Sequence, residues 1–293
     1  VAVHAFDYRA PDSLAGVLAE LEEAGDEGKA IAGGTALMIL MMQRLVRPRR
    51  LISLRRVAGL DRIEIADGRV RIGALATHRD VERSPVIRAR LPVLAETLSR
   101  VATLRIRNVA TLGGCLAHAD PNQDPPVALL ALDARVRIAG RQGERQVPLD
   151  EFFVDYYQTA LRPGELVVAV DVPLPTPGSA SAFHKFLPRT ADDYATVAVA
   201  ATVALTPEGA CREARIGLGA LGPTPLRARD AETILAGERL SDRVLAAASE
   251  AAMRIVDPIA DPRGSAEYKR QMAGVFVGRA LRRAWDRAAG AAA

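Results

Sequence analysis

Two pairs of adjacent glycines, each close to a threonine, constrain this 293-residue chain more than any other feature. Gly33 and Gly34 precede Thr35, and a second pair follows Thr111 by two residues. Glycine has no Cβ, so its backbone adopts positive φ at little cost and can bring N–H groups close to a bulky anion. A lone glycine pair is most often only a turn. Two such turns about 80 residues apart would suit a ligand with two phosphates.

The second pair lies in a richer stretch, residues 110–124 (ATLGGCLAHADPNQD). The Thr111 hydroxyl could donate to a phosphate oxygen. Asp124 could accept from a sugar hydroxyl or a ring N–H. Neither glycine pair matches the Rossmann fingerprint or the phosphate-binding P-loop, because no G-x-G-x-x-G follows a strand and no G-K-[ST] occurs.

Residues 1–58 predict a small unit of alternating strands and helices. Pro11 to Ser13 cap a helix whose apolar residues repeat at helical spacing, and Gly25 and Gly28 end it. The resulting order is β-α-β-α-β, and it places Gly33 and Gly34 at the carboxyl end of a strand. Ligands bind at that edge in open α/β sheets.

Residues 59–177 predict a second unit with a mixed or antiparallel sheet. Period-two alternation around Asp67-Gly68 indicates a hairpin, and Pro85 and Pro92 interrupt a helical region over 78–100. Further elements are expected at 125–132 (helix), 136–138 and 145–147 (hairpin) and 166–172 (the strongest strand).

A proline-rich segment, residues 173–178, is the best boundary in the chain because proline is stiff and cannot pair in a sheet. Residues 178–293 predict a third domain with a three-stranded antiparallel sheet (181–186, 195–205, 211–221) and a three-helix bundle (226–236, 241–255, 265–287). The expected fold is therefore α+β, with domains 1–58, 59–177 and 178–293.

Composition excludes several classes of function. Cys115 and Cys211 are the only cysteines, too few for a four-thiolate cluster; a disulfide between them is possible but not prompted by any pattern. The net charge is only +4 and arginine is spread along the chain, which argues against nucleic acid. The apolar run 39–42 is too short to span a bilayer, and no signal peptide is expected at Val1, so the chain is expected to be cytoplasmic. His78 is expected in a loop or cap, and no catalytic or metal-binding set is predicted.

Together, the two glycine motifs, Asp124, the stretch 183–186 (FHKF) and the stretch 192–195 (DDYA) resemble one family. It is the FAD-binding medium subunit of the molybdenum hydroxylases, of the carbon monoxide dehydrogenase and xanthine dehydrogenase type. The resemblance runs from Phe6 to Lys269 and implies an oxidoreductase subunit that binds FAD. The residues expected at the cofactor are Ala30, Ile31, Ala32, Gly33, Gly34, Thr35, Ala36, Leu37, Val101, Thr111, Gly113, Gly114, Cys115, His118, Asp124, Val167 and Lys185.

The resemblance also assigns roles. The backbone N–H groups of both glycine pairs would face the FAD pyrophosphate. Lys185 would lie near the flavin, where a cation raises the reduction potential; without the resemblance, a solvated strand residue would be the better interpretation. Cys115 stands where the family often has Asn, and Thr35 where some members have His. A covalent cysteinyl flavin at Cys115 is conceivable.

The implied partners are a large molybdopterin subunit and a small subunit with two [2Fe-2S] clusters, in a dimer of heterotrimers. Electrons would pass from the clusters to FAD and on to NAD or a quinone. Two alternatives stay open: a self-sufficient FAD-dependent oxidase or dehydrogenase, and a nucleotide-binding module without redox activity. The sequence leaves the substrate and the final acceptor open.

Overall fold

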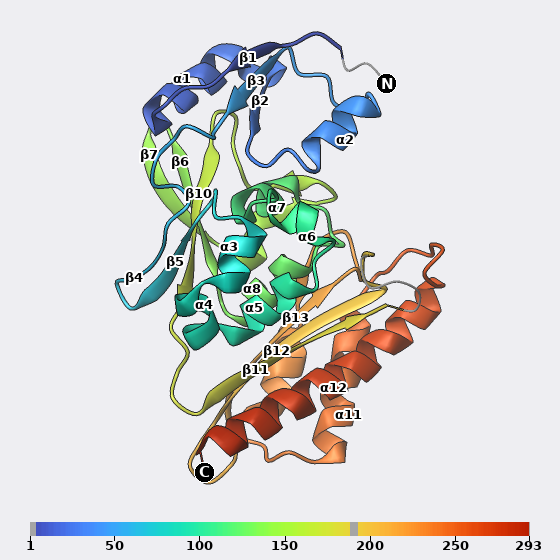
Figure 1. Ribbon diagram of the computed structural model, residues 1–293. Helices are drawn as coiled ribbons and strands as arrows, with labels where there is room; N and C mark the ends of the chain where they lie inside the picture. The colour runs from blue at the N-terminus through green and yellow to red at the C-terminus, as the bar shows by residue number, and fades with distance from the viewer. Residues whose placement is uncertain (1–3, 188–192, 293) are drawn as a thin grey trace.

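The computed structural model describes residues 4–187 and 193–292, and these form three units in chain order (Figure 1). The N-terminal and C-terminal units lie at opposite ends of the molecule, with the middle unit between them (Figure 1). The first unit has a parallel sheet, and the other two have antiparallel sheets. The α+β class predicted from the sequence is confirmed.

The N-terminal unit has the predicted β-α-β-α-β order, with its strands arranged β1-β3-β2. The Ser13 hydroxyl caps the first helix by accepting from the Gly16 N–H at 3.2 Å, and Val17 packs on Ile52 beneath it. The chain leaves the second strand directly into the first glycine pair. The elements are β1 (Asp7–Arg9), α1 (Leu14–Ala24), β2 (Gly28–Ile31), α2 (Leu37–Met42) and β3 (Arg50–Ser53).

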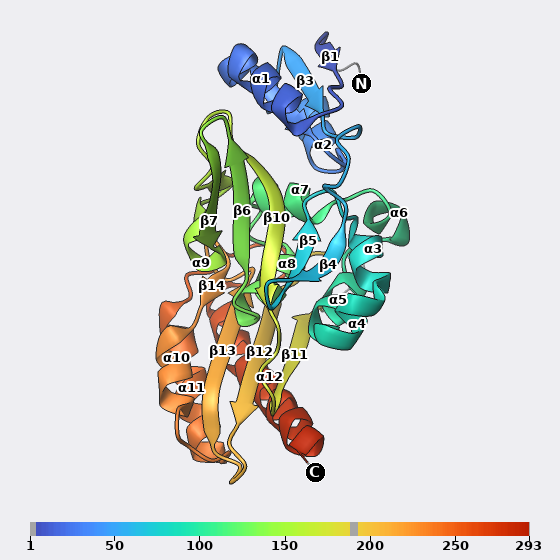
Figure 2. The same ribbon diagram turned by 90° about the vertical axis from the view of Figure 1, so that its left-hand side faces the viewer.

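The middle unit is built on a five-stranded sheet in the order β4-β5-β10-β6-β7, with the predicted strongest strand at its centre. Its helices lie on one side of this sheet (Figure 2). Two of them begin at Pro85 and Pro92, where a missing N–H costs nothing. The strands are β4 (Ile63–Ala66), β5 (Arg69–Gly73), β6 (Arg135–Gly140), β7 (Gly143–Pro148), β8 (Phe153–Asp155), β9 (Gln158–Thr159) and β10 (Leu166–Pro173). The helices are α3 (His78–Arg83), α4 (Pro85–Arg90), α5 (Pro92–Ser99), α6 (Leu104–Arg107), α7 (Leu112–His118), α8 (Asp124–Ala131) and α9 (Leu149–Phe152).

The C-terminal unit contains the three long antiparallel strands and three helices expected from the sequence, and a short fourth strand in addition. Leu226 and Arg227 pair with Leu218 and Gly217, so the next helix begins at Arg229, not at 226. The helices pack in chain order and cover one face of the sheet (Figure 1). The elements are β11 (Ser179–Phe186), β12 (Val197–Leu205), β13 (Cys211–Gly219), β14 (Leu226–Arg227), α10 (Arg229–Leu235), α11 (Asp242–Ile255) and α12 (Ala266–Ala292).

The C-terminal sheet is covered on both faces. Strand β12 is buried at every position, because Val199 packs against α11 and α12 while Ala200 faces the middle unit. Helix α8 lies directly on β13: a Cβ on Gly217 would stand 2.2 Å from the Val127 carbonyl oxygen. The middle and C-terminal units therefore share a core, in which helix α8 of the middle unit packs against the C-terminal sheet.

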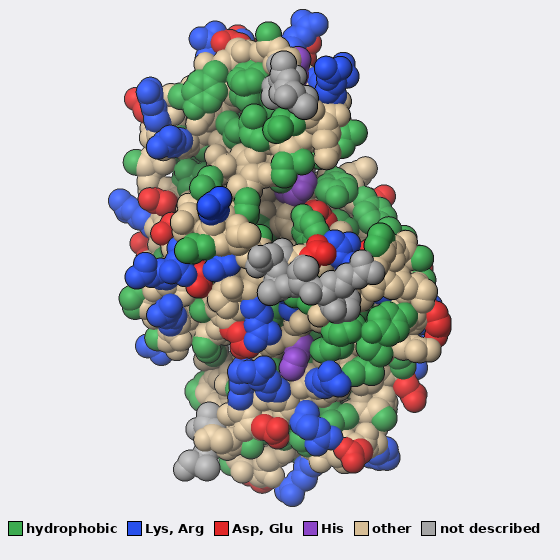
Figure 3. Space-filling model, turned by 45° about the vertical axis from the view of Figure 1, so that its right-hand side comes forward, with side chains coloured by type: hydrophobic (Ala, Val, Ile, Leu, Met, Phe, Trp, Pro, Cys, Tyr) green, Lys and Arg blue, Asp and Glu red, His purple; other side chains and the backbone are tan. Residues whose placement is uncertain are grey.

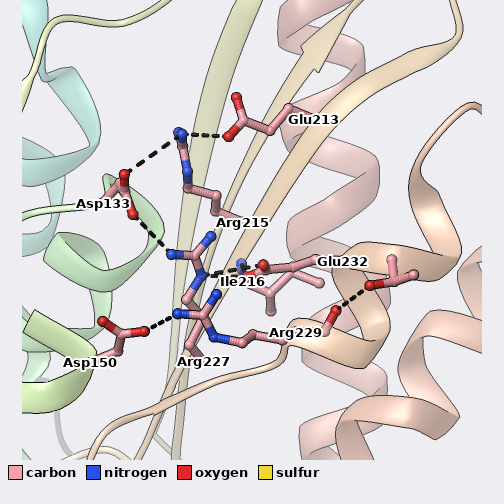
Figure 4. Close-up of polar contacts among 9 residues, drawn as sticks. Asp133, Asp150, Glu213, Arg215, Ile216, Arg227, Arg229 and Glu232 are labelled. Atoms are coloured by element: carbon pink, nitrogen blue, oxygen red, sulfur yellow. Dashed lines mark hydrogen bonds and ion pairs between the residues drawn. The ribbon is translucent and has the colours of Figure 1, made fainter. Parts of the chain in front are cut away.

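A polar network joins the same two units at the surface (Figure 4). Asp133, just after α8, accepts from Arg227 at 2.9 Å and pairs with Arg215 at 3.9 Å. Glu232 accepts from Arg227 at 2.9 Å and from the Ile216 N–H at 2.9 Å. These contacts hold β13, β14 and α10 against the end of α8.

Three smaller expectations can be compared with the structure. Cys115 in α7 and Cys211 in β13 are both free and buried, so the possible disulfide between them is not formed. His78 does not cap a helix: the cap of α3 is Thr77, whose side chain accepts from the Asp80 N–H. In the described part of the chain, no helix combines the length and the apolar character needed to cross a membrane.

Candidate functional site

The two glycine motifs lie against each other, although about 80 residues separate them in sequence. Gly33 passes so close to residues 109 and 110 that a Cβ on it would stand 2.0 Å from the Val109 carbonyl oxygen. A Cβ on Gly114 would lie 3.9 Å from the Ala32 Cβ. The prediction that both motifs border one site is consistent with this packing of the N-terminal unit on α7.

The first motif is a loop between β2 and α2 with unused hydrogen-bond donors. Within residues 4–187 and 193–292, the N–H groups of Gly33, Gly34, Thr35 and Ala36 donate to no other group. Gly34 has φ +71°, which favours glycine, and the whole loop is half-buried. Four N–H groups without a protein acceptor in one short loop are donors of the kind that an anion requires. Ala30 and Ile31 end β2 before the loop, and Leu37 begins α2 after it.

The second motif is not a turn but the start of helix α7. Thr111 is its N-cap and accepts from the Gly114 N–H at 3.1 Å, and the Gly113 N–H donates to the Ala74 carbonyl at 2.9 Å. The prediction that Gly113 and Gly114 supply free N–H donors is therefore wrong, because protein groups already accept from both. The Thr111 oxygen serves first as a helix cap.

Helix α7 nevertheless presents a face of small residues beside the first loop. Gly114 and Ala117 are exposed on that face, and half-buried His118 follows one residue later, with its ring 5.3 Å from that of Tyr157. Cys115 points the other way: it is buried, its Sγ contacts the Gln123 side-chain oxygen, and burial raises its pKa.

A buried ion pair joins the middle and C-terminal units near α7. Lys185 Nζ, on β11, lies 2.7 Å from Asp124 Oδ2, on α8, and donates to the Arg100 carbonyl at 3.0 Å. Their side chains are only 3% and 4% exposed, so the interpretation of Lys185 as a solvated strand residue is wrong. Asp124 Oδ1 has no partner among the described residues. Burial raises the pKa of Asp124 to about 6, although the Lys185 charge opposes the rise.

The two remaining predicted residues, Val101 and Val167, belong to the core of the middle unit. Val101 is half-buried and packs on the middle core, next to Arg100. Val167 lies in β10, is 5% exposed and belongs to the same core. Arg100 and Lys185 also border an open hollow of about 500 Å³ whose other walls come from Ser99, Ala102, Thr103, Leu104, Arg107 and Leu187.

Three residues near the site were missed by sequence reasoning. Asp120, after α7, is buried and accepts from the Asn122 N–H at 2.9 Å; the Asp120-Pro121 pair was the signal for such a turn. Burial and then Asp120 raise the pKa of Tyr194, which lies in the DDYA stretch and had no predicted role. Tyr157 gave no signal in the sequence. Asp192 of the same stretch lies outside the described residues.

Comparison with known proteins identifies the family. Residues 4–175 match the family model of the FAD binding domain in molybdopterin dehydrogenase, and residues 182–284 match that of the CO dehydrogenase flavoprotein C-terminal domain. The chain is 42% identical to the 6-hydroxypseudooxynicotine dehydrogenase complex subunit alpha of Paenarthrobacter nicotinovorans, over 97% of this chain and 95% of that one. It is 37% identical to the carbon monoxide dehydrogenase medium chain of Hydrogenophaga pseudoflava, over 97% and 98%.

Solved structures agree with this assignment. Carbon monoxide dehydrogenase from Hydrogenophaga pseudoflava, in a form that lacks the Mo-pyranopterin moiety, superposes with a TM-score of 0.95 at 38% identity, covering 98% of this chain and 99% of that one. Quinoline 2-oxidoreductase from Pseudomonas putida 86 gives 0.92 at 34% identity, covering 98% and 99%. The chain therefore belongs to the FAD-binding medium subunits of the molybdenum hydroxylases, an oxidoreductase family that includes the carbon monoxide dehydrogenase medium chains.

Proposed function

We propose that this chain binds FAD between the first glycine loop, the small-residue face of α7 and the Asp124–Lys185 pair, and relays electrons through it. The observation that carries the proposal is the loop of residues 33–36, whose four N–H groups are unused among the described residues. The FAD pyrophosphate is an anion that needs converging donors of this kind. Bound FAD would supply the means to accept electrons one at a time and to release them singly or as a pair.

The predicted site residues divide into three roles in this proposal. The loop residues Ala30, Ile31, Ala32, Gly33, Gly34, Thr35, Ala36 and Leu37 would hold the pyrophosphate by backbone N–H groups. Thr111, Gly113, Gly114, Cys115 and His118 would shape α7 so that the cofactor can approach it closely. Val101, Asp124, Val167 and Lys185 would border the flavin. Asp124 Oδ1 accepts from no group among the described residues, which leaves one acceptor for a hydroxyl or ring N–H of the cofactor.

We further propose the partners that the family resemblance implies. A large molybdopterin subunit would oxidise the substrate, and a small subunit would pass electrons through two [2Fe-2S] clusters to this chain, in a dimer of heterotrimers with NAD or a quinone as acceptor. Two lines of support come from this molecule. Its relatives are subunits of dehydrogenase complexes, and its two cysteines are too few to hold a [2Fe-2S] cluster by thiolates.

The loop proposal is tested by Thr35→Asp, with Thr35→Asn as the matched control. A carboxylate beside the free N–H groups would repel the pyrophosphate and compete for the same donors, whereas asparagine has the same shape without the charge. Aspartate is favourable just before a helix, so folding should not suffer. We expect FAD affinity, measured by fluorescence titration of the flavin-free chain, to fall about tenfold or more in Thr35→Asp only. Equal affinity in the two variants would contradict pyrophosphate binding at this loop.

A further inference from the structure

One stretch of surface concentrates positive charge beside the candidate site. It is formed by Arg100, Arg279, Arg283 and Arg287, which we call the arginine surface. Three of its members stand four residues apart on α12, so they share one face of that helix over two turns. Figure 3 shows Lys and Arg side chains gathered around a histidine in the lower half of the molecule.

Three of these guanidinium groups, those of Arg100, Arg279 and Arg287, contact an aromatic ring or a backbone carbonyl. Arg279 lies 4.9 Å above the Phe276 ring and Arg100 lies 6.0 Å from the centre of the Phe183 ring. Arg287 donates to the Ser181 carbonyl at 2.7 Å. Each guanidinium has five N–H donors, so most of them stay available.

One carboxylate, Glu96, meets three of the four arginines within the described part of the chain. It lies 2.9 Å from Arg100, 3.6 Å from Arg283 and 3.4 Å from Arg287. The surface therefore keeps a net positive charge. His184, which the same arginines face, responds to it: burial and then Arg283 and Arg100 lower its pKa, against a smaller opposing effect of Glu96.

The arginine surface is continuous with the candidate cofactor site. The Arg100 carbonyl accepts from Lys185 Nζ, the partner of Asp124, and Arg100 and Lys185 both border the open hollow. Anything seated on Arg100 and α12 would therefore stand beside the residues that we propose to border the flavin.

We infer that the arginine surface docks a small acidic electron-carrier protein, which would take electrons from the cofactor site proposed above. The inference rests on that proposed function. In each encounter the carrier would gain one electron and the site would lose one. Electron-transfer encounters are small and brief, so a limited surface of exposed charge can serve one. Exposed charges of one sign speed such encounters by steering.

The shape of the surface favours a protein over a single small anion. Residues 279 and 287 stand about 12 Å apart along the helix, farther than one phosphate group reaches. Guanidinium forks match carboxylates in pairs, and such an extended row suits the aspartate and glutamate side chains of an acidic protein.

The test uses the intact complex that contains this chain, with an oxidised plant-type [2Fe-2S] ferredoxin as the acidic probe. Binding is measured by calorimetry at low and at physiological salt. The double variant Arg279→Gln/Arg283→Gln removes two charges of the surface. The control Arg282→Gln removes one from the same helix, where Arg282 is bound to Asp242 at 2.6 Å. We expect the double variant to weaken ferredoxin binding about tenfold at low salt and to reduce the salt dependence, and the control to change binding less than about twofold.

Three results would overturn the inference. They are no ferredoxin binding to the wild-type complex, equal losses in the double variant and the control, or arginine-dependent binding of anionic vesicles or NADPH in place of ferredoxin. The FAD content of each preparation is measured in parallel. A complex without FAD would refute the proposed function, whereas a complex with FAD and no arginine-dependent binding would refute only the docking surface.

Discussion

At the scale of single residues, the Asp124–Lys185 pair has the sharpest physical consequence. Both charges are desolvated when the protein folds, and their mutual attraction offsets only part of the desolvation free energy. Asp124 keeps one oxygen without a partner among the described residues, which leaves its charged form poorly solvated. The pair therefore connects the middle and C-terminal units. The same burial favours protonation of Asp124 at a pH below neutral.

This pair makes stability depend on pH in a defined direction. Because folding raises the pKa of Asp124 from 3.8 to about 6, the stabilisation is fully present below pH 3.8 and is lost as the pH rises through about 6. The difference corresponds to roughly 3 kcal/mol. We expect the unfolding free energy of the wild type, relative to Asp124→Asn/Lys185→Met, to fall over that range in urea titrations of the ligand-free chain. Parallel curves for the two proteins would contradict a raised pKa at Asp124.

Some residues of the site were predictable from the sequence and others were not. The unused N–H groups of Gly33, Gly34 and Thr35 were predictable, because a strand followed by two glycines leaves few local partners for the next N–H groups; their contact with the cofactor stays a prediction. Gly113 and Gly114 were misjudged, because their chemistry depends on the Ala74 carbonyl and the Thr111 side chain, and the first of these is distant in sequence. The ion pair of Asp124 and Lys185 joins two units, so no local pattern could reveal it.

At the scale of elements, helix α7 shows why paired glycines need not form a turn. Glycine is a poor helix former, so the pair predicted a turn. The helix forms because Thr111 caps it and because only glycine fits at position 113, where a Cβ would stand 2.4 Å from the Ala74 Cβ and 2.8 Å from its carbonyl oxygen. A tertiary contact thus overrides the intrinsic preference.

The tight contact at Gly113 can be tested by adding one methyl group. We expect Gly113→Ala to lower the unfolding free energy by about 2–4 kcal/mol, because backbone atoms of Ala74 must move to make room. Gly290→Ala is the control: Gly290 is also helical, but a Cβ there meets nothing within 4 Å, so that variant should gain up to about 1 kcal/mol. Both are measured by urea unfolding. A neutral or stabilising Gly113→Ala would show that α7 does not rest on Ala74.

Most other elements followed from periodicity and from proline or glycine at their ends. The five elements of residues 1–58 and the interruptions of the helical region at Pro85 and Pro92 were predicted correctly. Strand β14 was missed, since two residues are too few to show a period. The domain limits at 58 and 177 stay predictions; the core shared between α8 and β13 means that the second limit does not separate two independent cores.

At the scale of the whole molecule, the position of the C-terminal unit decides whether Lys185 meets Asp124. Helix α8 packs on β13, and Arg227 fastens β14 to Asp133 beyond the end of that helix (Figure 4). The Arg227 and Glu232 side chains are 13% and 10% exposed, so their pair is shielded from water, whereas the Asp133 side chain is 46% exposed. A shielded ion pair of this kind fixes the relative positions of its side chains even where its net contribution to the free energy of unfolding is small.

Removal of the Arg227 side chain should weaken the contact between the middle and C-terminal units. We expect Arg227→Ala to lower the unfolding free energy by about 2–3 kcal/mol, because Asp133 and Glu232 lose a shared partner. Arg229→Ala is the control, since the Arg229 side chain is 64% exposed and its pair with Asp150 should contribute less than about 1 kcal/mol. The single tryptophan, Trp285 in α12, reports unfolding of the C-terminal unit by fluorescence. Equal effects of the two substitutions would contradict a special role for Arg227.

The most direct measurement on the whole molecule is its cofactor content. The purified chain, alone and with its partner subunits, is examined by visible absorption and then precipitated with acid. We predict flavin absorption bands and close to one FAD per chain released into the supernatant, because Cys115 is buried and its raised pKa disfavours the thiolate. A flavin retained in the precipitate would contradict this non-covalent site. Failure to bind added FAD, even with the partner subunits present, would contradict the proposed function itself.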